Sequence, residues 1–307
     1  MAGGVINTGS HPKLLWPGLH TTWGQIYNEY GEEYVHLVDI YDSTKAYEQD
    51  YQVTGFGLAQ QKAQGSPGYF DSEIGGIVTT YNHIAYTLGF IVTYEEEADN
   101  QYKEVAERRL KRNAISMKQT VENIVANMYN NAFNNSAPYL FGDGQPMISA
   151  SHPFVTGGTG SNALTPAADL SEAAIEDLTI QIMQTTDDRG LRFSFMPQSL
   201  HIAPAEWYNA NRILKSVLQS DTANNNLNIL RAEGVFPKGI QLNHYFTSPH
   251  AWFIRTNCPN GPTMFWRNRP DLKMDNDFDT YNHKYLSYMR LSVGITDWRG
   301  VFGSNGP

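Results

Sequence analysis

The chain has 307 residues, a mass of 34.5 kDa, a formal net charge of −9 and a sequence pI of about 5.4. So acidic a chain is a poor candidate for a protein that binds nucleic acid by neutralising its phosphates. The apolar fraction of 41% allows a sizeable core and excludes overall disorder. The sequence contains neither a signal-peptide pattern nor the run of ~20 apolar residues that a membrane span needs.

Charged residues make up only 17% of the chain, below the roughly 25% of ordinary soluble domains, while aromatic residues reach 12%. Aromatic enrichment with few charges is typical of the centre of protein–protein interfaces. An aromatic-rich core inside a monomer fits the composition equally well. The single cysteine, Cys258, cannot form an internal disulfide, is consistent with a reducing cytoplasm, and is expected to be a small buried hydrophobe.

The first 96 residues are rich in structure breakers and β-forming residues. Up to residue 44, repeated Gly and Pro predict an irregular arm with one short helix over 21–30. Its large apolar side chains, Trp16 and Trp23 among them, need a surface to lie against, in their own chain or in a neighbour. From residue 45 to 94 we expect two strands joined by a turn at 65–68. Such a hairpin is marginal alone and must pack on something.

Residues 95–133 contain no Pro or Gly, and their apolar residues recur at intervals of three and four. This spacing predicts one amphipathic helix of roughly 50 Å, with Asp99 as its N-cap and with acidic residues at its start. A basic run includes Arg108, Arg109 and Arg112. It is interpreted as a solvated helix face or as an intersubunit patch that meets Glu95 and Glu96 of a neighbour.

The remainder of the chain alternates helical and extended patterns typical of a mixed domain. Helices are expected at 171–186, capped by Ser171 or Asp169, and at 204–218; strands are expected at 193–203, 240–246, 251–256 and 285–302, the last with a bend at Gly294. The polar stretch 219–226 is expected to be an exposed tip.

Catalytic signatures are absent from the sequence: there is no phosphate-binding loop, HExxH, GxSxG or CxxC. The Gly-rich stretch 157–161 lacks the lysine of a phosphate loop and is expected to be flexible. The acidic clusters at 187–188 and 275–279 are interpreted as acidic turns rather than cation sites. Five histidines could meet in space but are expected to be structural: His152, His201, His244, His250 and His283. The sequence therefore predicts no catalytic residue, no cofactor and no metal.

The order of these elements resembles the major capsid protein of tailed bacteriophages, an α+β chain of the Hong Kong 97-type fold. The resemblance covers essentially the whole chain and, less closely, extends to the gpT-type head subunits of Mu-like phages. It depends on the helix at 103–133, on the strand–Pro–x–x–Trp–helix segment at 200–207 with 213–215, and on the ending at 288–303. The order and lengths of the elements carry it, rather than any single motif.

The resemblance implies an N-terminal arm (1–44), an extended β-hairpin loop (45–96), a spine helix (97–136), a peripheral domain in two parts (137–197 and 276–307) and an axial domain (198–275). It implies assembly with copies of itself into pentamers and hexamers of an icosahedral shell, in the cytoplasm of a bacterial host. A portal would occupy one vertex, and packaged double-stranded DNA would be contacted weakly. A decoration or cement protein is left open.

The sequence begins at the arm, so a separate scaffolding protein is expected, and a membrane is not a partner. Residues expected to contact neighbouring subunits are Trp16, Trp23, Lys62, Tyr69, Phe70, Glu95, Glu96, Arg108, Arg109 and Arg112. Lys62 matches by position the lysine through which some relatives form an isopeptide crosslink, but no partner asparagine can be matched, so no crosslink is predicted. Two alternatives remain open: an encapsulin-like compartment shell, and an α+β hydrolase with a site built from scattered His and Asp residues.

Overall fold

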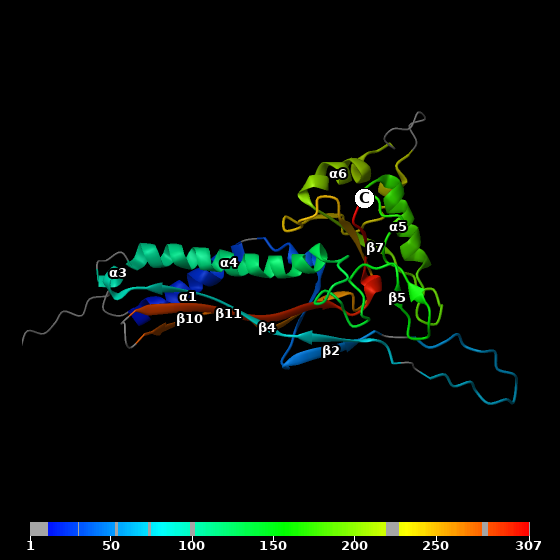
Figure 1. The fold of residues 1–307 in the computed structure, drawn as a ribbon, viewed down its shortest axis with the longest axis horizontal. Coiled ribbons are helices and arrows are strands. Elements are labelled where there is room, and N and C mark those ends of the chain that lie inside the picture. Colours follow the sequence, from blue (N-terminus) through cyan, green and yellow to red (C-terminus); the bar gives the residue numbers. More distant parts are fainter. Residues whose placement is uncertain are drawn as a thin grey trace, which may run out of the picture.

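The computed structural model describes residues 12–29, 31–52, 55–72, 75–98, 102–218, 227–277 and 282–306. Its longest helix, α4 (Tyr102–Asn130), has 29 residues and therefore a length of about 43 Å. This helix lies along one face of a long sheet, and a second sheet with further helices stands at the end of α4 nearer its C-terminus (Figure 1). The mixed α+β architecture agrees with the fold class expected from the sequence.

The apolar stripe of α4 explains why the helix lies where it does. Leu110, Ala114, Val121 and Val125 are fully buried and belong to one core with the inward side chains of the long sheet. On the opposite side of the helix Lys111, Arg112, Gln119 and Asn123 lie at the surface, as the three-and-four spacing requires. The stripe therefore faces the subunit's own core.

The long sheet has the strand order β1 (Asp39–Asp42), β10 (Pro262–Asn276), β11 (His283–Ile295) and β4 (Ile84–Val92). Strand β1 pairs with β10 in parallel, and the other two pairings are antiparallel. Along β11 the side chains alternate, so that Tyr285 and Met289 are buried towards α4 while Leu286 is exposed. One face of the sheet therefore supplies the floor on which the helix packs.

The second sheet has the order β12 (Val301–Ser304), β9 (Trp252–Thr256), β7 (Pro197–Ile202) and β8 (Ile240–Leu242). Helix α5 (Glu172–Gln184) packs on one face, in a core with Trp252. The next residue, Phe253, points to the other core and meets Tyr129 of α4 edge to face, with ring centroids 5.2 Å apart. Strand β9 thus joins the two cores. The N-cap prediction for α5 is confirmed, because the Ser171 side chain accepts a hydrogen bond from Ala174 N.

The remaining elements are short. They are α2 (Tyr34–Leu37), β5 (His152–Pro153), β6 (Thr159–Gly160), η2 (Pro204–Glu206), α6 (Trp207–Lys215), α7 (Ile229–Ala232) and η3 (Trp298–Gly300). The predicted tip at 219–226, the predicted N-cap Asp99 and the side chain of Trp16 lie outside the described residues.

The single long helix predicted over 95–133 is wrong at its start. A separate helix, α3 (Tyr94–Ala98), precedes α4, and Glu96 forms an ion pair with Arg109 at 2.8 Å. On one continuous helix these two residues would lie about 20 Å apart. The start of α3 is fixed by Thr93, whose hydroxyl accepts from Glu96 N while the Glu96 carboxylate accepts from Thr93 N. This reciprocal pair is a capping box.

Within the irregular arm predicted up to residue 44, the short helix expected at 21–30 begins much earlier, at residue 12. Helix α1 runs over Pro12–Glu29, although Pro17 and Gly18 lie inside it. The apolar face that includes Trp23 and Ile26 is buried in the core beside α4. Packing on a neighbouring helix outweighs the poor helix propensity of these residues.

The predicted hairpin is a ladder only at its base. Strand β2 (Tyr47–Tyr51) pairs with β3 (Val78–Asn82), whereas residues 55–72 form no strand. The second half of the predicted return strand is β4, which pairs with β11 of the long sheet instead. Gly76 permits the close approach at the base, because a Cβ there would lie 1.7 Å from the carbonyl oxygen of Gln52.

The C-terminal strand predicted over 285–302 is two strands in two different sheets. Strands β11 and β12 are separated by η3, whose start is capped by the Asp297 carboxylate on Arg299 N. The break between the two strands lies at residues 296–300, just after Gly294, where the bend was expected. Gly294 lies inside β11, where a Cβ would come within 2.8 Å of the Tyr81 ring. Strand β10, beside β11, was not predicted.

Replacing Val121 with Asp should abolish the folded subunit. An unpaired carboxylate would be placed in the core between α4 and the long sheet, at a cost of several kcal/mol. The measurement is the yield of soluble protein and its unfolding in urea. Gln119→Asp, on the exposed face of the same helix, is the matched control and should remain folded. A soluble Val121→Asp variant of ordinary stability would contradict this account of the core.

Candidate assembly surface

The segment 55–72, here called the projecting loop, carries large apolar side chains away from both cores. It extends from the base ladder β2–β3 into free space (Figure 1). Phe70 is 91% exposed and Leu58 is 76% exposed, and Phe56 and Tyr69 are also exposed. An isolated subunit gains nothing from holding such side chains in water. The loop therefore has the character of a surface that another chain covers.

Three residues of this loop were predicted from the sequence to contact neighbouring subunits. Lys62, Tyr69 and Phe70 are all exposed, and Lys62 lies next to the turn at the loop tip, where Ser66 N donates to Ala63 O. Their exposure leaves them available for such a contact.

Trp23, also predicted to contact a neighbour, is instead part of its own subunit's core. It is 3% exposed, its ring stacks on Tyr27, and its indole N–H donates to Asn113 Oδ1 at 3.0 Å. The sequence prediction is corrected because α1 folds back along α4.

Asn113 of α4 joins four elements at this point. Besides accepting from Trp23 of α1, its Oδ1 accepts from the hydroxyl of Ser287 in β11. Its amide nitrogen donates to Leu88 O of β4 at 3.0 Å. A buried amide with its donor and acceptor engaged fixes the register of helix, arm and sheet against one another.

Of the charged residues on α3 and α4 that were predicted to contact a neighbouring subunit, some pair within the subunit and others are exposed. Glu96 accepts two hydrogen bonds from the guanidinium of Arg109, which holds the pKa of the Glu96 carboxyl below its usual range. This ion pair therefore forms inside the subunit, where the sequence suggested a pair between subunits. Glu95, Arg108 and Arg112 are exposed.

Exposed apolar side chains also occur around α6 and α7. Tyr208 is 79% exposed, and Val217, Leu218, Leu227 and Ile229 are exposed beside it. This region corresponds to the predicted axial domain and flanks the segment 219–226. It is the second surface on which copies of the chain could meet.

The carboxylate of Glu122 attaches the arm to α4. It is 2% exposed, and its two oxygens accept from the backbone N–H groups of Glu33 and Tyr34 at 2.8 and 2.9 Å. Burial, helped by the neighbouring carboxylates of Glu33 and Glu32 and opposed by the two N–H groups, raises the pKa of Glu122 to about 7. Lys118, one helical turn earlier, donates to Tyr27 O and pairs with Glu32.

The histidines that could have formed a catalytic or metal site have separate partners. His152 contacts Asp143 and Asn162, His201 contacts Ser199, and His283 contacts Asn276. Burial keeps the pKa of His201 well below its ordinary value. His244 contacts Glu33, and His250 pairs with Asp169.

Among the described residues, no three His, Cys, Asp or Glu side chains lie close enough together to hold a metal ion. Asp188, in the acidic cluster at 187–188, binds the guanidinium of Arg299. Cys258 is buried as expected. Within the same part of the chain, no helix has the length and apolar character needed to cross a membrane.

Comparison with known proteins decides the family. The family model described as phage capsid protein matches residues 77–303, well over half of the chain. The chain belongs to the phage capsid protein family. The matched region begins just before β3 and includes α4 and most strands of both sheets, while β1 and β2 lie outside it. No curated protein matches the chain.

Solved structures show the same fold at low sequence identity. A virus-like particle from Pyrococcus furiosus has a TM-score of 0.55 at 11% identity, with 94% of this chain and 98% of that chain covered. A chain from Microbacterium phage Oxtober96 has a TM-score of 0.52 at 9% identity, covering 91% and 92%. A chain from Mycobacterium phage Adephagia has a TM-score of 0.52 at 11% identity, covering 91% of each. The capsid protein has the Hong Kong 97-type fold that the order of its elements resembles.

Trp23→Ala should lower the free energy of unfolding of the unassembled capsid subunit by about 3–5 kcal/mol, because it removes a buried ring and leaves Asn113 without its indole donor. Urea unfolding followed by circular dichroism measures this. Phe70→Ala is the matched control and should leave the unfolding midpoint unchanged. Equal stability of the Trp23→Ala subunit would mean that the arm does not pack on its own α4.

Glu122→Gln should flatten the pH dependence of subunit stability between about pH 4.5 and 7. In this window the folded state keeps a proton on Glu122 that the unfolded chain has released, so raising the pH lowers the free energy of unfolding. The contribution is on the order of 2 kcal/mol. The readout is urea unfolding at several pH values, with the exposed Glu95→Gln as control. Identical pH slopes for Glu122→Gln and the unaltered protein would contradict the shift.

Proposed function

We propose that this capsid protein is the major head subunit of a tailed phage. It assembles with copies of itself into pentamers and hexamers of an icosahedral shell that encloses double-stranded DNA. Membership in the phage capsid family supports its place in the capsid of the virion. Its role is structural, as it is for its relatives, and the separate partners of its histidines and acidic clusters agree with that role.

The observation that carries the proposal is the projecting loop. It presents exposed aromatic and aliphatic side chains, Phe70 above all, at a distance from the subunit's own cores. When a copy's loop lies over the next copy, this apolar surface is removed from water, and the contact is heterologous. Heterologous contacts that close on themselves generate rings, as pentamers and hexamers require. The exposed apolar group around α6 and α7 supplies the contact at the ring centre.

The partners follow from the same proposal. A portal at one vertex, a separate scaffolding protein during assembly in the bacterial cytoplasm, and DNA held weakly fit a chain with a net charge of −9. An acidic wall repels the phosphate backbone and allows packed DNA to move.

An encapsulin-like compartment shell is the second candidate, because the similar solved structures include a virus-like particle. Electron microscopy of the purified protein tests whether particles form, and analysis of their contents separates the two candidates. Double-stranded DNA in particles from infected cells supports the phage head. Enclosed protein cargo without DNA supports the compartment, and a ~35 kDa monomer under assembly conditions would contradict both.

Deleting residues 60–69 should leave a folded subunit that does not close stable shells. The deletion removes the loop tip and Tyr69, but it leaves the base ladder β2–β3 and both cores in place. Circular dichroism checks the fold, and negative-stain micrographs check assembly. Normal particles from this variant would show that the projecting loop is not a contact between subunits.

A further inference from the structure

The projecting loop is tied to the body of the subunit at one carboxylate. Asp71 Oδ2 accepts a hydrogen bond from Gly57 N at 2.7 Å and from Arg189 Nη1 at 2.5 Å. Arg189 Nη2 also donates to Ser72 O. We call these contacts the clasp. Because Gly57 and Asp71 lie on opposite limbs of the loop, the clasp joins the limbs to each other and both to Arg189.

The clasp is closely packed and charged. A Cβ at Gly57 would lie 3.2 Å from Asp71 Oδ2 and 3.4 Å from Arg189 Nη1, so a larger residue would crowd both groups. The Gly57 N–H, with Ser72 N–H and Arg189, holds the pKa of Asp71 below its usual range, so the carboxylate is ionised at neutral pH. The Arg189 side chain is 15% exposed and that of Asp71 is 21% exposed. This ion pair is therefore more enclosed than an ordinary surface pair.

Arg189 is held in place by a tight turn. Asp187 Oδ1 accepts from Arg189 N and from Leu191 N, at 2.9 and 2.7 Å. Gly190 has a φ of +78°, a conformation that favours glycine. A β-bridge between Thr186 and Arg192 closes the turn. The backbone that carries Arg189 is thus fixed by its own local hydrogen bonds.

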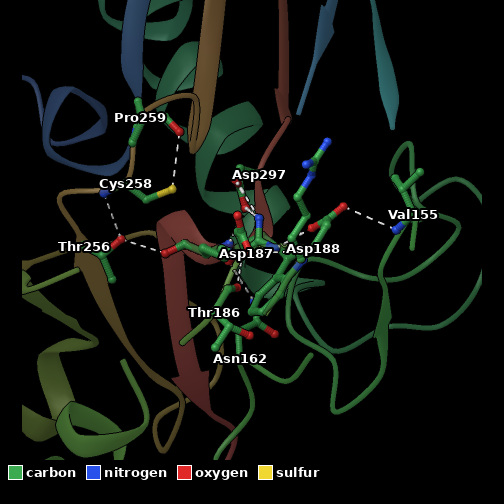
Figure 2. Close-up of polar contacts among 12 residues, drawn as sticks. Val155, Asn162, Thr186, Asp187, Asp188, Thr256, Cys258, Pro259 and Asp297 are labelled. Atoms are coloured by element: carbon green, nitrogen blue, oxygen red, sulfur yellow. Dashed lines mark hydrogen bonds and ion pairs between the residues drawn. The ribbon is translucent and has the colours of Figure 1, made fainter. Parts of the chain in front are cut away.

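The turn that carries Arg189 is held by the buried side chain of Arg299. Arg299 Nη2 donates to Asp188 Oδ1 at 2.6 Å, Arg299 Nε donates to Thr186 O at 3.0 Å, and Arg299 Nη1 pairs with Asp297 at 3.2 Å. Asp188 also accepts from Val155 N (Figure 2). Asp188 and Arg299 are nearly fully buried. The clasp therefore connects the loop to a rigid point between the second sheet and the segment 154–156.

This geometry makes the clasp a pivot for the loop. Seven residues lie between Gly57 and the turn at Gly65, and five between that turn and Asp71, so the tip can lie at most roughly 20 Å beyond the clasp. A rotation of about 10° at the clasp would displace the tip by roughly 3–4 Å over that length. In a closed shell the same contact is repeated many times, so the direction of the loop fixes the angle between adjacent copies.

We propose that the Arg189–Asp71 clasp sets the direction in which the projecting loop leaves the subunit, and thereby the size of the assembled shell. The inference rests on the proposed role of the loop as a contact between subunits. Arg189 and Asp71 act as positioning residues: they hold the loop, and the loop's exposed side chains make the contact with the next copy.

The test uses the full-length chain with Arg189→Gln and with Asp71→Asn. Arg192→Gln, which makes the same charge change three residues further on at an exposed position, is the matched control. Spin labels at Lys62→Cys and Gln119→Cys, in a Cys258→Ala background, report the distance from the loop tip to α4 in the unassembled subunit. Electron micrographs of assembled particles report their diameters.

We expect a narrow distance distribution for the unaltered and Arg192→Gln chains, and a broadened or shifted one for Arg189→Gln and Asp71→Asn. Particles of these two variants should fall into more than one size class, while their subunits unfold at the same urea concentration as the control. Unchanged distances would overturn the clasp as a pivot. Changed distances with unchanged particle diameters would overturn its control of shell size.

These outcomes are separable from failure of the proposed function. If deletion of residues 60–69 leaves normal particles, the loop is not a subunit contact and the link from the clasp to shell size is overturned with it. If that deletion prevents assembly while the clasp variants match the control in both readouts, the proposed function stands and only the clasp inference is overturned.

Discussion

The packing of α4 on the long sheet is the interaction on which the other parts of the subunit depend. The apolar stripe of the helix is buried against β4 and β11, and α1 packs on the same helix. Tyr129, near the C-terminal end of α4, extends this core to Phe253 in the second sheet, and its hydroxyl donates to Leu37 O. A single helix of about 43 Å therefore connects the arm, the long sheet and the second sheet.

Buried polar groups decide how these parts are aligned. Hydrophobic contacts are non-directional, so they leave a helix free to slide or rotate on a sheet. Asn113 binds α1, β4 and β11 at once, and Glu122 binds the backbone at the start of α2. Arg299, in η3, donates hydrogen bonds to the turn at 186–190 and so aligns these two segments. Each of these three side chains opposes sliding or rotation of the packed elements, because such a movement would leave a buried polar group unpaired at a cost in free energy.

The subunit divides its aromatic residues between two tasks. Part of the aromatic enrichment is explained by an aromatic-rich core inside the subunit, which contains Trp23, Tyr129, Trp252 and Phe253. Phe70 and the other apolar residues of the projecting loop are exposed, which agrees with the interface interpretation. The core therefore accounts for part of the aromatic enrichment, and the exposed apolar residues are available for an interface.

Some features that sequence reasoning missed had a signal. Thr93 followed three residues later by Glu96 is a capping box and marks the start of α3. Met264, Trp266 and Leu272 recur at even spacing, which is the pattern of a half-buried strand, and they lie in β10. Other features had none. The clasp joins Asp71 to Arg189 across 118 residues, and no local pattern predicts such a pair.

The sequence by itself determined the amphipathic stripe of α4 and the N-cap of α5, because helical periodicity and caps act over a few residues. Tertiary structure alone decided which strands pair, that β4 belongs to the long sheet, and that Trp23 lies inside the subunit. It also decided that Glu96 and Arg109 meet within one chain. These outcomes depend on contacts between residues far apart in the sequence, where burial and hydrogen-bond geometry outweigh local propensity.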